Sequence, residues 1–269
     1  GIELIKDEAV SVDREKKIIN LKNHEQLQYD KLVFATGSLP IIPDIPGVEK
    51  ENVFPVRKEF DYLRDVLDKV REAKNIVIIG GGFIGVEFAD ECRKNPGVKV
   101  TVVEMQEYCL KIAMDDEFCD DAEKKLAEAG VKIYKNEQVI AIRGNDNVEE
   151  VELSSGEKIK ADVVILGIGS APNSTLAEES RLELGYRNGI KVDRFMRTFT
   201  DKDIFACGDC CTKESFFDGK PSAVMLASVA TAEARIAGAN LFSPVHHNSG
   251  VISVFATIIN DRADRKSVV

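Results

Sequence analysis

The sequence has no tryptophan, only three histidines, few cysteines and no excess of positive charge. Its 36 lysines and arginines stand against 46 aspartates and glutamates, which gives a formal net charge of -10. Because no basic stripe is present to attract phosphates, we expect neither a nucleic-acid nor a membrane-surface partner. The longest apolar run, 251–259, is also too short to span a bilayer.

The six cysteines are too scattered for the disulfide framework of a small secreted domain. The charged first residues do not resemble a signal peptide either. We therefore expect reduced thiols and a cytoplasmic location. The sequence starts at Gly1 rather than at methionine, so we expect the natural start to lie upstream.

A strand, a glycine-rich turn and a helix follow one another from residue 75. The β-branched run 75–79 leads into three glycines, and an apolar stripe of Ile84, Phe88 and Cys92 marks the helix after them. One further strand and one further helix follow, and the helix ends before Gly130. This alternation predicts an α/β fold. The expected elements are parallel strands 75–79, 99–104, 131–134 and 161–166, helices 83–93 and 116–129, and an antiparallel meander within 141–160.

The turn carries the spacing Gly80-x-Gly82-x-x-Gly85, which is typical of dinucleotide-binding folds. Gly80 permits the tight turn, Gly82 lets the backbone approach a pyrophosphate, and Gly85 lets helix and strand pack closely. The helix N-terminus then offers amide groups and a positive dipole to the phosphates. Glu104 ends the next strand, where a carboxylate accepts hydrogen bonds from the adenosine ribose and repels a 2′-phosphate. The pattern predicts NAD(H) rather than NADP(H).

The sequence contains an internal repeat. Residues 30–40 and 162–172 share an aspartate, a glycine, a serine and a proline at the same spacing, and each follows a segment of alternating polarity. The glycine fingerprint begins at Gly80, 89 residues ahead of Gly169. The same distance counted back from Gly37 falls before Gly1, so we expect the first copy's fingerprint to lie outside this sequence.

Three ordered motifs resemble the pyridine nucleotide-disulfide oxidoreductase family. They are NIVIIGGGFIGVEFAD at 75–90, ATGSLP at 35–40 and TDKDIFACGDC at 200–210. Within the family the similarity is to NADH oxidases, NADH peroxidases and coenzyme A-disulfide reductases. It implies hydride transfer from NADH to FAD and onward to oxygen, peroxide or a disulfide. Two alternatives stay open: an NADH-dependent reductase of rubredoxin or ferredoxin, and a non-catalytic NAD(H)-binding module.

The resemblance implies two three-layer, Rossmann-like domains, with the NAD domain inserted into a discontinuous FAD domain. The implied boundaries are 1–53 and 172–248 for FAD, 54–171 for NAD(H), and 249–269 for the start of an α+β dimerisation domain. The full-length protein is then expected to be a homodimer that uses a small-molecule electron acceptor. Because the FAD pyrophosphate loop is expected ahead of Gly1, these 269 residues alone should bind NADH but retain little FAD.

The resemblance also assigns roles to individual residues. Phe83 would be the aromatic gate that covers the flavin until nicotinamide displaces it, and Glu87 would lie near the nicotinamide amide; these two are the candidate catalytic residues. Asp209 would hydrogen-bond the ribityl chain of FAD. The remaining candidate cofactor-binding residues are Gly80, Gly82, Ile84, Gly85, Glu104, Gly167 and Gly169 for NAD(H), and Ala35, Thr36, Gly37, Gly208, Leu226 and Ala227 for FAD.

Other signals are expected to be structural. Cys207-x-x-Cys210 encloses the glycine and aspartate of the FAD motif, and no second such pair completes a zinc site. His246-His247 is isolated, so we expect no metal. The charged segment 121–128 is predicted to be a solvated helix surface with i,i+4 ion pairs. Residues 261–269 match no part of the family pattern.

Overall fold

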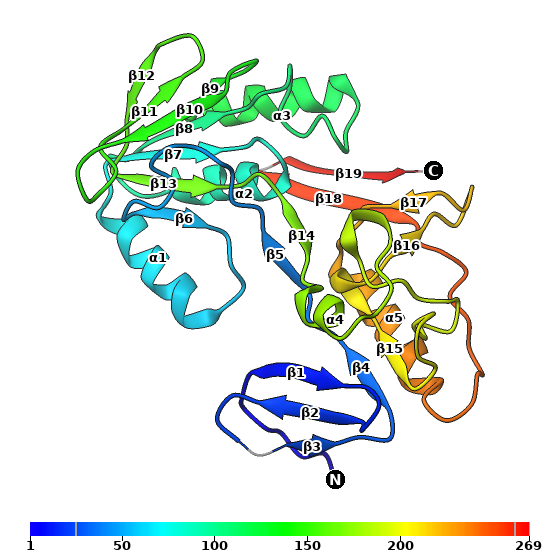
Figure 1. Cartoon of the computed structure of the whole chain (residues 1–269). Helices are drawn as coiled ribbons and strands as arrows, with labels where there is room; N and C mark the ends of the chain where they lie inside the picture. Colours follow the sequence, from blue (N-terminus) through cyan, green and yellow to red (C-terminus); the bar gives the residue numbers. More distant parts are fainter. Residues whose placement is uncertain (25, 261, 269) are drawn as a thin grey trace. The chain divides into compact units, whose positions relative to one another are not determined.

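The computed structural model describes residues 1–24, 26–260 and 262–268 (Figure 1). The chain divides into two compact units. The first unit comprises residues 1–39 and 171–253, and the second unit comprises 40–170 and 254–268.

The second unit is built on a parallel sheet with helices between its strands, which confirms the predicted α/β class. The helices are α1 (Phe60–Glu72), α2 (Phe83–Cys92) and α3 (Asp116–Glu128). In order across the sheet, the strands are β6 (Val53–Pro55), β13 (Val163–Leu166), β7 (Asn75–Ile79), β8 (Lys99–Val103) and β9 (Lys132–Tyr134).

Both faces of this sheet are covered, so β13 is apolar throughout and β7 is apolar from Ile76 to Ile79. Successive side chains of a strand point to opposite faces. Ile76 and Ile78 of β7 pack with residues of α1, α2 and α3, whereas Val77 and Ile79 pack with an antiparallel meander. Burial of each such aliphatic side chain contributes about 1.5–3 kcal/mol. The meander consists of β10 (Val139–Arg143), β11 (Glu150–Leu153) and β12 (Lys158–Lys160).

The second unit begins earlier in the sequence than the predicted NAD domain. Segment 40–53 belongs to it because Ile45 and Val48 pack on the meander side of the sheet. The Ile142 amide also donates a hydrogen bond of 2.8 Å to the Pro46 carbonyl. The unit further includes most of the hairpin formed by β18 (Ser253–Ile259) and β19 (Arg262–Val268).

The first unit has a short parallel pair at its centre. Strands β4 (Leu32–Phe34) and β15 (Ile204–Ala206) pair in register. A core that includes Phe205, Ile190 and Met196 packs around them. The unit also contains a meander, two α-helices and a hairpin. They are β1 (Ala9–Asp13), β2 (Ile18–Leu21) and β3 (Leu27–Gln28), then α4 (Thr175–Glu179) and α5 (Ala227–Ala239), and β16 (Lys213–Glu214) with β17 (Pro221–Ser222). Two short 3-10 helices, η1 (Tyr186–Asn188) and η2 (Gly208–Cys210), complete it.

The structure repeats the order of elements that the repeated sequence predicts. In the first copy the meander β1–β3 precedes β4 and the short β5 (Ser38–Pro40). In the second, β10–β12 precedes β13 and β14 (Ser170–Pro172). Both meanders have a register irregularity at the same place in their first strand. Gly37 and Gly169 both adopt positive φ, +69° and +97°, which glycine tolerates without strain.

Candidate dinucleotide-binding site

The glycine turn of the second unit connects the end of β7 to the start of α2. Gly82 is the N-cap residue of α2, and no side chain in the described chain caps this end. The first-turn amides of a helix have no intrahelical partner, and the helix dipole places positive potential there. The turn therefore offers the donors and the field that an anionic phosphate requires.

The three fingerprint glycines differ in how much space a side chain would have at each position. A Cβ on Gly85 would lie 1.9 Å from the Gly80 carbonyl oxygen, so Gly85 is needed for helix and strand to pack. Gly80 has a φ of +101°, and its Cβ would lie 2.7 Å from the Gly167 oxygen. A Cβ on Gly82, in contrast, would meet no other described heavy atom within 4 Å. Of the three fingerprint glycines, only Gly82 leaves space that the described residues do not fill.

Glu104 ties the turn to the end of β8. Its side chain is 8% exposed; Oε2 accepts a hydrogen bond of 2.6 Å from the Gly81 amide, and Oε1 accepts one of 2.7 Å from the Gln106 amide. A carboxylate oxygen has two lone pairs, so each oxygen retains capacity for a ribose hydroxyl. The sequence pattern did not indicate that Glu104 also accepts hydrogen bonds from backbone amides of the protein.

The two glycines after β13 differ from each other. Gly167 packs directly on the turn, since its Cβ would lie 3.0 Å from the Gly85 Cα. Its amide donates a hydrogen bond of 2.8 Å to the Ile79 carbonyl. Gly169 is exposed, and a Cβ there would meet nothing within 4 Å in the described chain. Packing explains a glycine at 167, whereas at 169 the positive φ of +97° does.

The predicted nicotinamide-side residues lie along α2. Phe83 is half-buried and stacks on Phe255 of β18, with ring centroids 5.3 Å apart and an interplanar angle of 13°. One turn later, Glu87 accepts a hydrogen bond of 3.3 Å from the Thr257 hydroxyl. Ile84 points outward and is 39% exposed. Strand β18 therefore contacts both candidate catalytic side chains.

The predicted FAD-side motifs meet at one edge of the first unit. Because β4 and β15 are parallel neighbours, the Ala35-Thr36-Gly37 turn and the Gly208-Asp209 turn leave the same edge. The Ser38 hydroxyl donates a hydrogen bond of 2.9 Å to Asp209 Oδ2. Leu226 is the N-cap of α5 and Ala227 its first residue, and α5 packs with Ala230 against Gly208.

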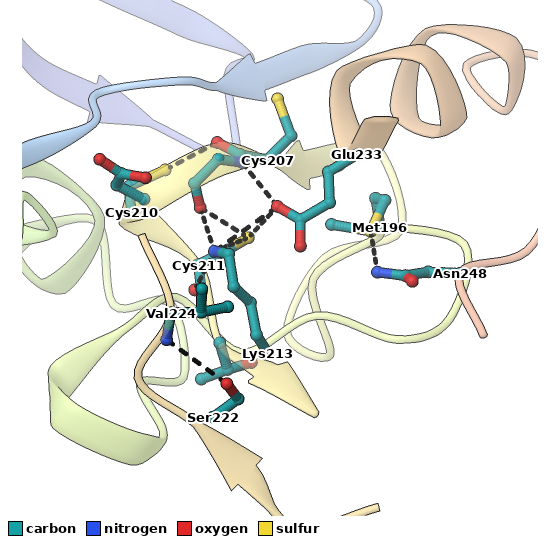
Figure 2. Close-up of polar contacts among 12 residues, drawn as sticks. Met196, Cys207, Cys210, Cys211, Lys213, Ser222, Val224, Glu233 and Asn248 are labelled. Atoms are coloured by element: carbon teal, nitrogen blue, oxygen red, sulfur yellow. Dashed lines mark hydrogen bonds and ion pairs between the residues drawn. The ribbon is translucent and has the colours of Figure 1, made fainter. Parts of the chain in front are cut away.

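A buried ion pair holds the Gly208 peptide from two sides (Figure 2). Glu233 Oε2 accepts a hydrogen bond of 2.8 Å from the Gly208 amide, and Lys213 Nζ donates one of 2.6 Å to the Gly208 carbonyl. The two charged atoms lie 3.5 Å apart, with both side chains 2% exposed. Burial raises the pKa of Glu233 above its ordinary value. Sequence reasoning missed both residues because neither belongs to a motif.

The cysteines near this turn are buried, free thiols. Burial raises the pKa of Cys207 to about 11, which disfavours the reactive thiolate. Figure 2 shows the Cys207 and Cys210 sulfur atoms pointing to different sides. The Cys210 thiol donates a hydrogen bond of 3.3 Å to the Cys207 carbonyl oxygen. Among the described residues, no three His, Cys, Asp or Glu side chains are grouped to hold a metal ion. Of the described helices, none is long and apolar enough to cross a membrane.

One expectation holds only in part: Lys124 forms an exposed i,i+4 ion pair with Asp120, as predicted for this helix, but the surface is not solvated throughout. Helix segment 121–128 is not a purely solvated surface, because Glu123 is buried at 8% exposure. Its carboxylate accepts a hydrogen bond of 2.7 Å from the Cys109 amide and pairs with Lys135 at 2.8 Å. The local pattern of charges did not reveal this long-range partner.

The parallel sheet, the glycine turn and the carboxylate at the end of β8 define a dinucleotide-binding α/β protein. The pattern of the family described as pyridine nucleotide-disulphide oxidoreductase matches residues 1–234. The chain therefore belongs to this family, as the resemblance predicted. Enzymes of the family are FAD-dependent and use NAD(H), which are the two predicted cofactors.

The chain is similar in sequence and structure to several oxidases and reductases. The chain is 31% identical over 240 residues to an NADH oxidase of Enterococcus faecalis, covering 87% of this chain and 52% of that protein. It is 34% identical to a rubredoxin-NAD(+) reductase of Pseudomonas putida, covering 79% and 54%. A solved NAD-dependent persulfide reductase from A. fulgidus superposes with a TM-score of 0.91 at 32% identity, covering 97% and 48%. The chain thus spans about half the length of the relatives it matches.

Proposed function

We propose that this chain is part of an NADH-dependent flavoprotein oxidoreductase whose second unit binds NADH. When bound, NADH supplies the hydride and FAD accepts it, so the protein contributes binding, orientation and electrostatics. The observation that carries the proposal is the contrast within the glycine turn. Packing of the protein requires Gly80 and Gly85, whereas the open position at Gly82 is explained by a ligand that approaches the backbone.

The geometry around Glu104 supports NADH over NADPH. Its carboxylate lies beside the glycine turn, where the adenosine ribose of a bound dinucleotide would be held. The same negative charge would repel a 2′-phosphate. Phe83 and Glu87 are proposed to contact the nicotinamide, which their position one turn apart at the start of α2 supports.

The first unit is proposed to supply part of the FAD site and to be the domain into which the NAD domain is inserted. Asp209, beside the Ala35-Thr36-Gly37 turn, would bind the ribityl hydroxyls. Strand β18 is proposed to begin an α+β dimerisation domain in a homodimer. A cytoplasmic location is proposed because all six cysteines are free, buried thiols.

The electron acceptor is proposed to be oxygen, peroxide or a disulfide. A rubredoxin- or ferredoxin-type acceptor is the second candidate, because the rubredoxin reductase relative is as similar as the NADH oxidase. Stopped-flow reduction of the complete, FAD-loaded protein by NADH, followed by each acceptor in turn, separates the two. A flavin spectrum that NADH does not bleach would favour a non-catalytic NAD(H)-binding module.

NADH binding can be tested on the 269-residue chain itself. Isothermal titration with NADH and NADPH should give a measurable dissociation constant for NADH and a clearly weaker one for NADPH. Absence of NADH binding by the folded chain would refute the proposed site.

A further inference from the structure

The segment between β8 and α3 makes hydrogen bonds to both backbone groups of Gly81. The Glu104 carboxylate accepts a hydrogen bond from the Gly81 amide, and the Leu110 amide donates one of 2.8 Å to the Gly81 carbonyl. The thiol of Cys109 packs against the same residue, because a Cβ on Gly81 would lie 2.5 Å from its sulfur. The shape of the glycine turn therefore depends on where the backbone of residues 109–110 lies.

Glu123 holds that backbone by a hydrogen bond. From α3, its Oε1 accepts the Cys109 amide at 2.7 Å, while Oε2 pairs with Lys135 Nζ at 2.8 Å. Lys135 also lies 4.4 Å from the centroid of the Tyr108 ring. The hydrogen bond that Lys135 donates to Glu123 raises the pKa of Lys135 above its ordinary value. One buried carboxylate thus anchors the segment that supports Gly81.

The first unit contains a comparable arrangement. There a buried glutamate on a helix, Glu233, accepts a backbone amide of the Gly208 turn and pairs with a lysine. In both units the glutamate comes from a helix distant in sequence from the turn. Each unit therefore has a buried, helix-borne glutamate that accepts a backbone amide, in the Gly208 turn in one unit and at Cys109, beside Gly81, in the other.

We infer that Glu123 is a positioning residue for NADH, which holds the Cys109 backbone against Gly81 and thereby keeps the turn open at Gly82. The inference rests on the proposed NADH site. A merely structural role for Glu123 has a different consequence: its loss would lower the unfolding temperature and leave the NADH dissociation constant of the folded protein unchanged.

The test compares three variants of the 269-residue chain by isothermal titration with NADH, well below their unfolding temperatures. Glu123→Ala removes the acceptor for the Cys109 amide and should raise the dissociation constant about tenfold. Glu123→Gln keeps an oxygen for that amide and should stay within about threefold of the parent chain. The control is Asp120→Asn on the same helix, which breaks an exposed ion pair with Lys124 and should change the constant less than about twofold.

Hydrogen–deuterium exchange gives a second measurement. It uses only the unmodified chain, so it does not depend on whether a variant folds. NADH should slow amide exchange in residues 108–110 as well as in the glycine turn, because the two are tied together. Protection confined to the turn would overturn the inference. So would an unchanged dissociation constant in folded Glu123→Ala, or a Glu123→Gln variant as weak as Glu123→Ala. If the parent chain itself does not bind NADH, the proposed site fails rather than the role of Glu123.

Discussion

Gly82→Ala should separate binding from folding. Gly82 has φ −71° and ψ −176°, extended backbone that alanine also adopts, and the added methyl meets no other described heavy atom within 4 Å. Replacing glycine by alanine in a compatible conformation stabilises a protein by about 0.4–1 kcal/mol. Alanine is a poorer N-cap than glycine, which offsets part of this gain. The net change in unfolding free energy should therefore be within about 1 kcal/mol.

The effect on NADH binding should be much larger. The methyl group would occupy the space that lets the pyrophosphate approach the first-turn amides of α2. A hydrogen bond to a charged group contributes about 1.5–3 kcal/mol. Losing one of them corresponds to a rise in the dissociation constant of about 10- to 150-fold, at 1.4 kcal/mol per factor of ten.

The assay is a thermal melt and an NADH titration of each variant, with Gly85→Ala as the comparison. At Gly85 the new Cβ would lie 1.9 Å from the Gly80 oxygen, so that variant should lose both stability and binding. A Gly82→Ala protein that binds NADH within threefold of the parent chain would refute the reasoning. So would a loss of stability as large as that of Gly85→Ala.

Three further predictions concern charged groups. Glu104→Gln should lower the ratio of the NADPH to the NADH dissociation constant about tenfold, because it removes a charge near the 2′ position; an unchanged ratio in titrations with both nucleotides would contradict this. Lys213→Met leaves Glu233 buried without a countercharge and should cost about 3–5 kcal/mol in urea unfolding. Lys213→Met combined with Glu233→Gln should recover part of that loss, and no recovery would argue against the charge explanation. Hydrogen bonds from two lysines lower the pKa of Asp203 below its ordinary 3.8. Its stabilisation is therefore present above that pH and lost as the pH falls through the folded-state pKa. Asp203→Asn should destabilise the chain more at about pH 7 than at about pH 3, because the contribution starts to fall below the unfolded-state pKa, and equal destabilisation at both would refute this.

The sequence by itself determined those features that depend on local spacing. The run 75–79, the three glycines after it and the helical stripe of α2 are set by side-chain periodicity and by the backbone freedom of glycine. The repeat of meander, strand and Gly-Ser-x-Pro turn was visible because both copies keep the same short-range order. Glu104 could be recognised because it stands at the end of the strand that follows the turn.

Only the tertiary structure showed which distant residues complete these local motifs. Glu233 lies 25 residues from the Gly208 amide that it accepts, and Glu123 lies 14 residues from that of Cys109. In the sequence both look like ordinary surface glutamates of charged or small-residue helices. Their roles depend on burial and on hydrogen-bond partners that adjoin them only after helix and sheet have packed. The contact of Gly167 with Gly85 arises in the same way, because it needs two neighbouring parallel strands whose pairing no local pattern specifies.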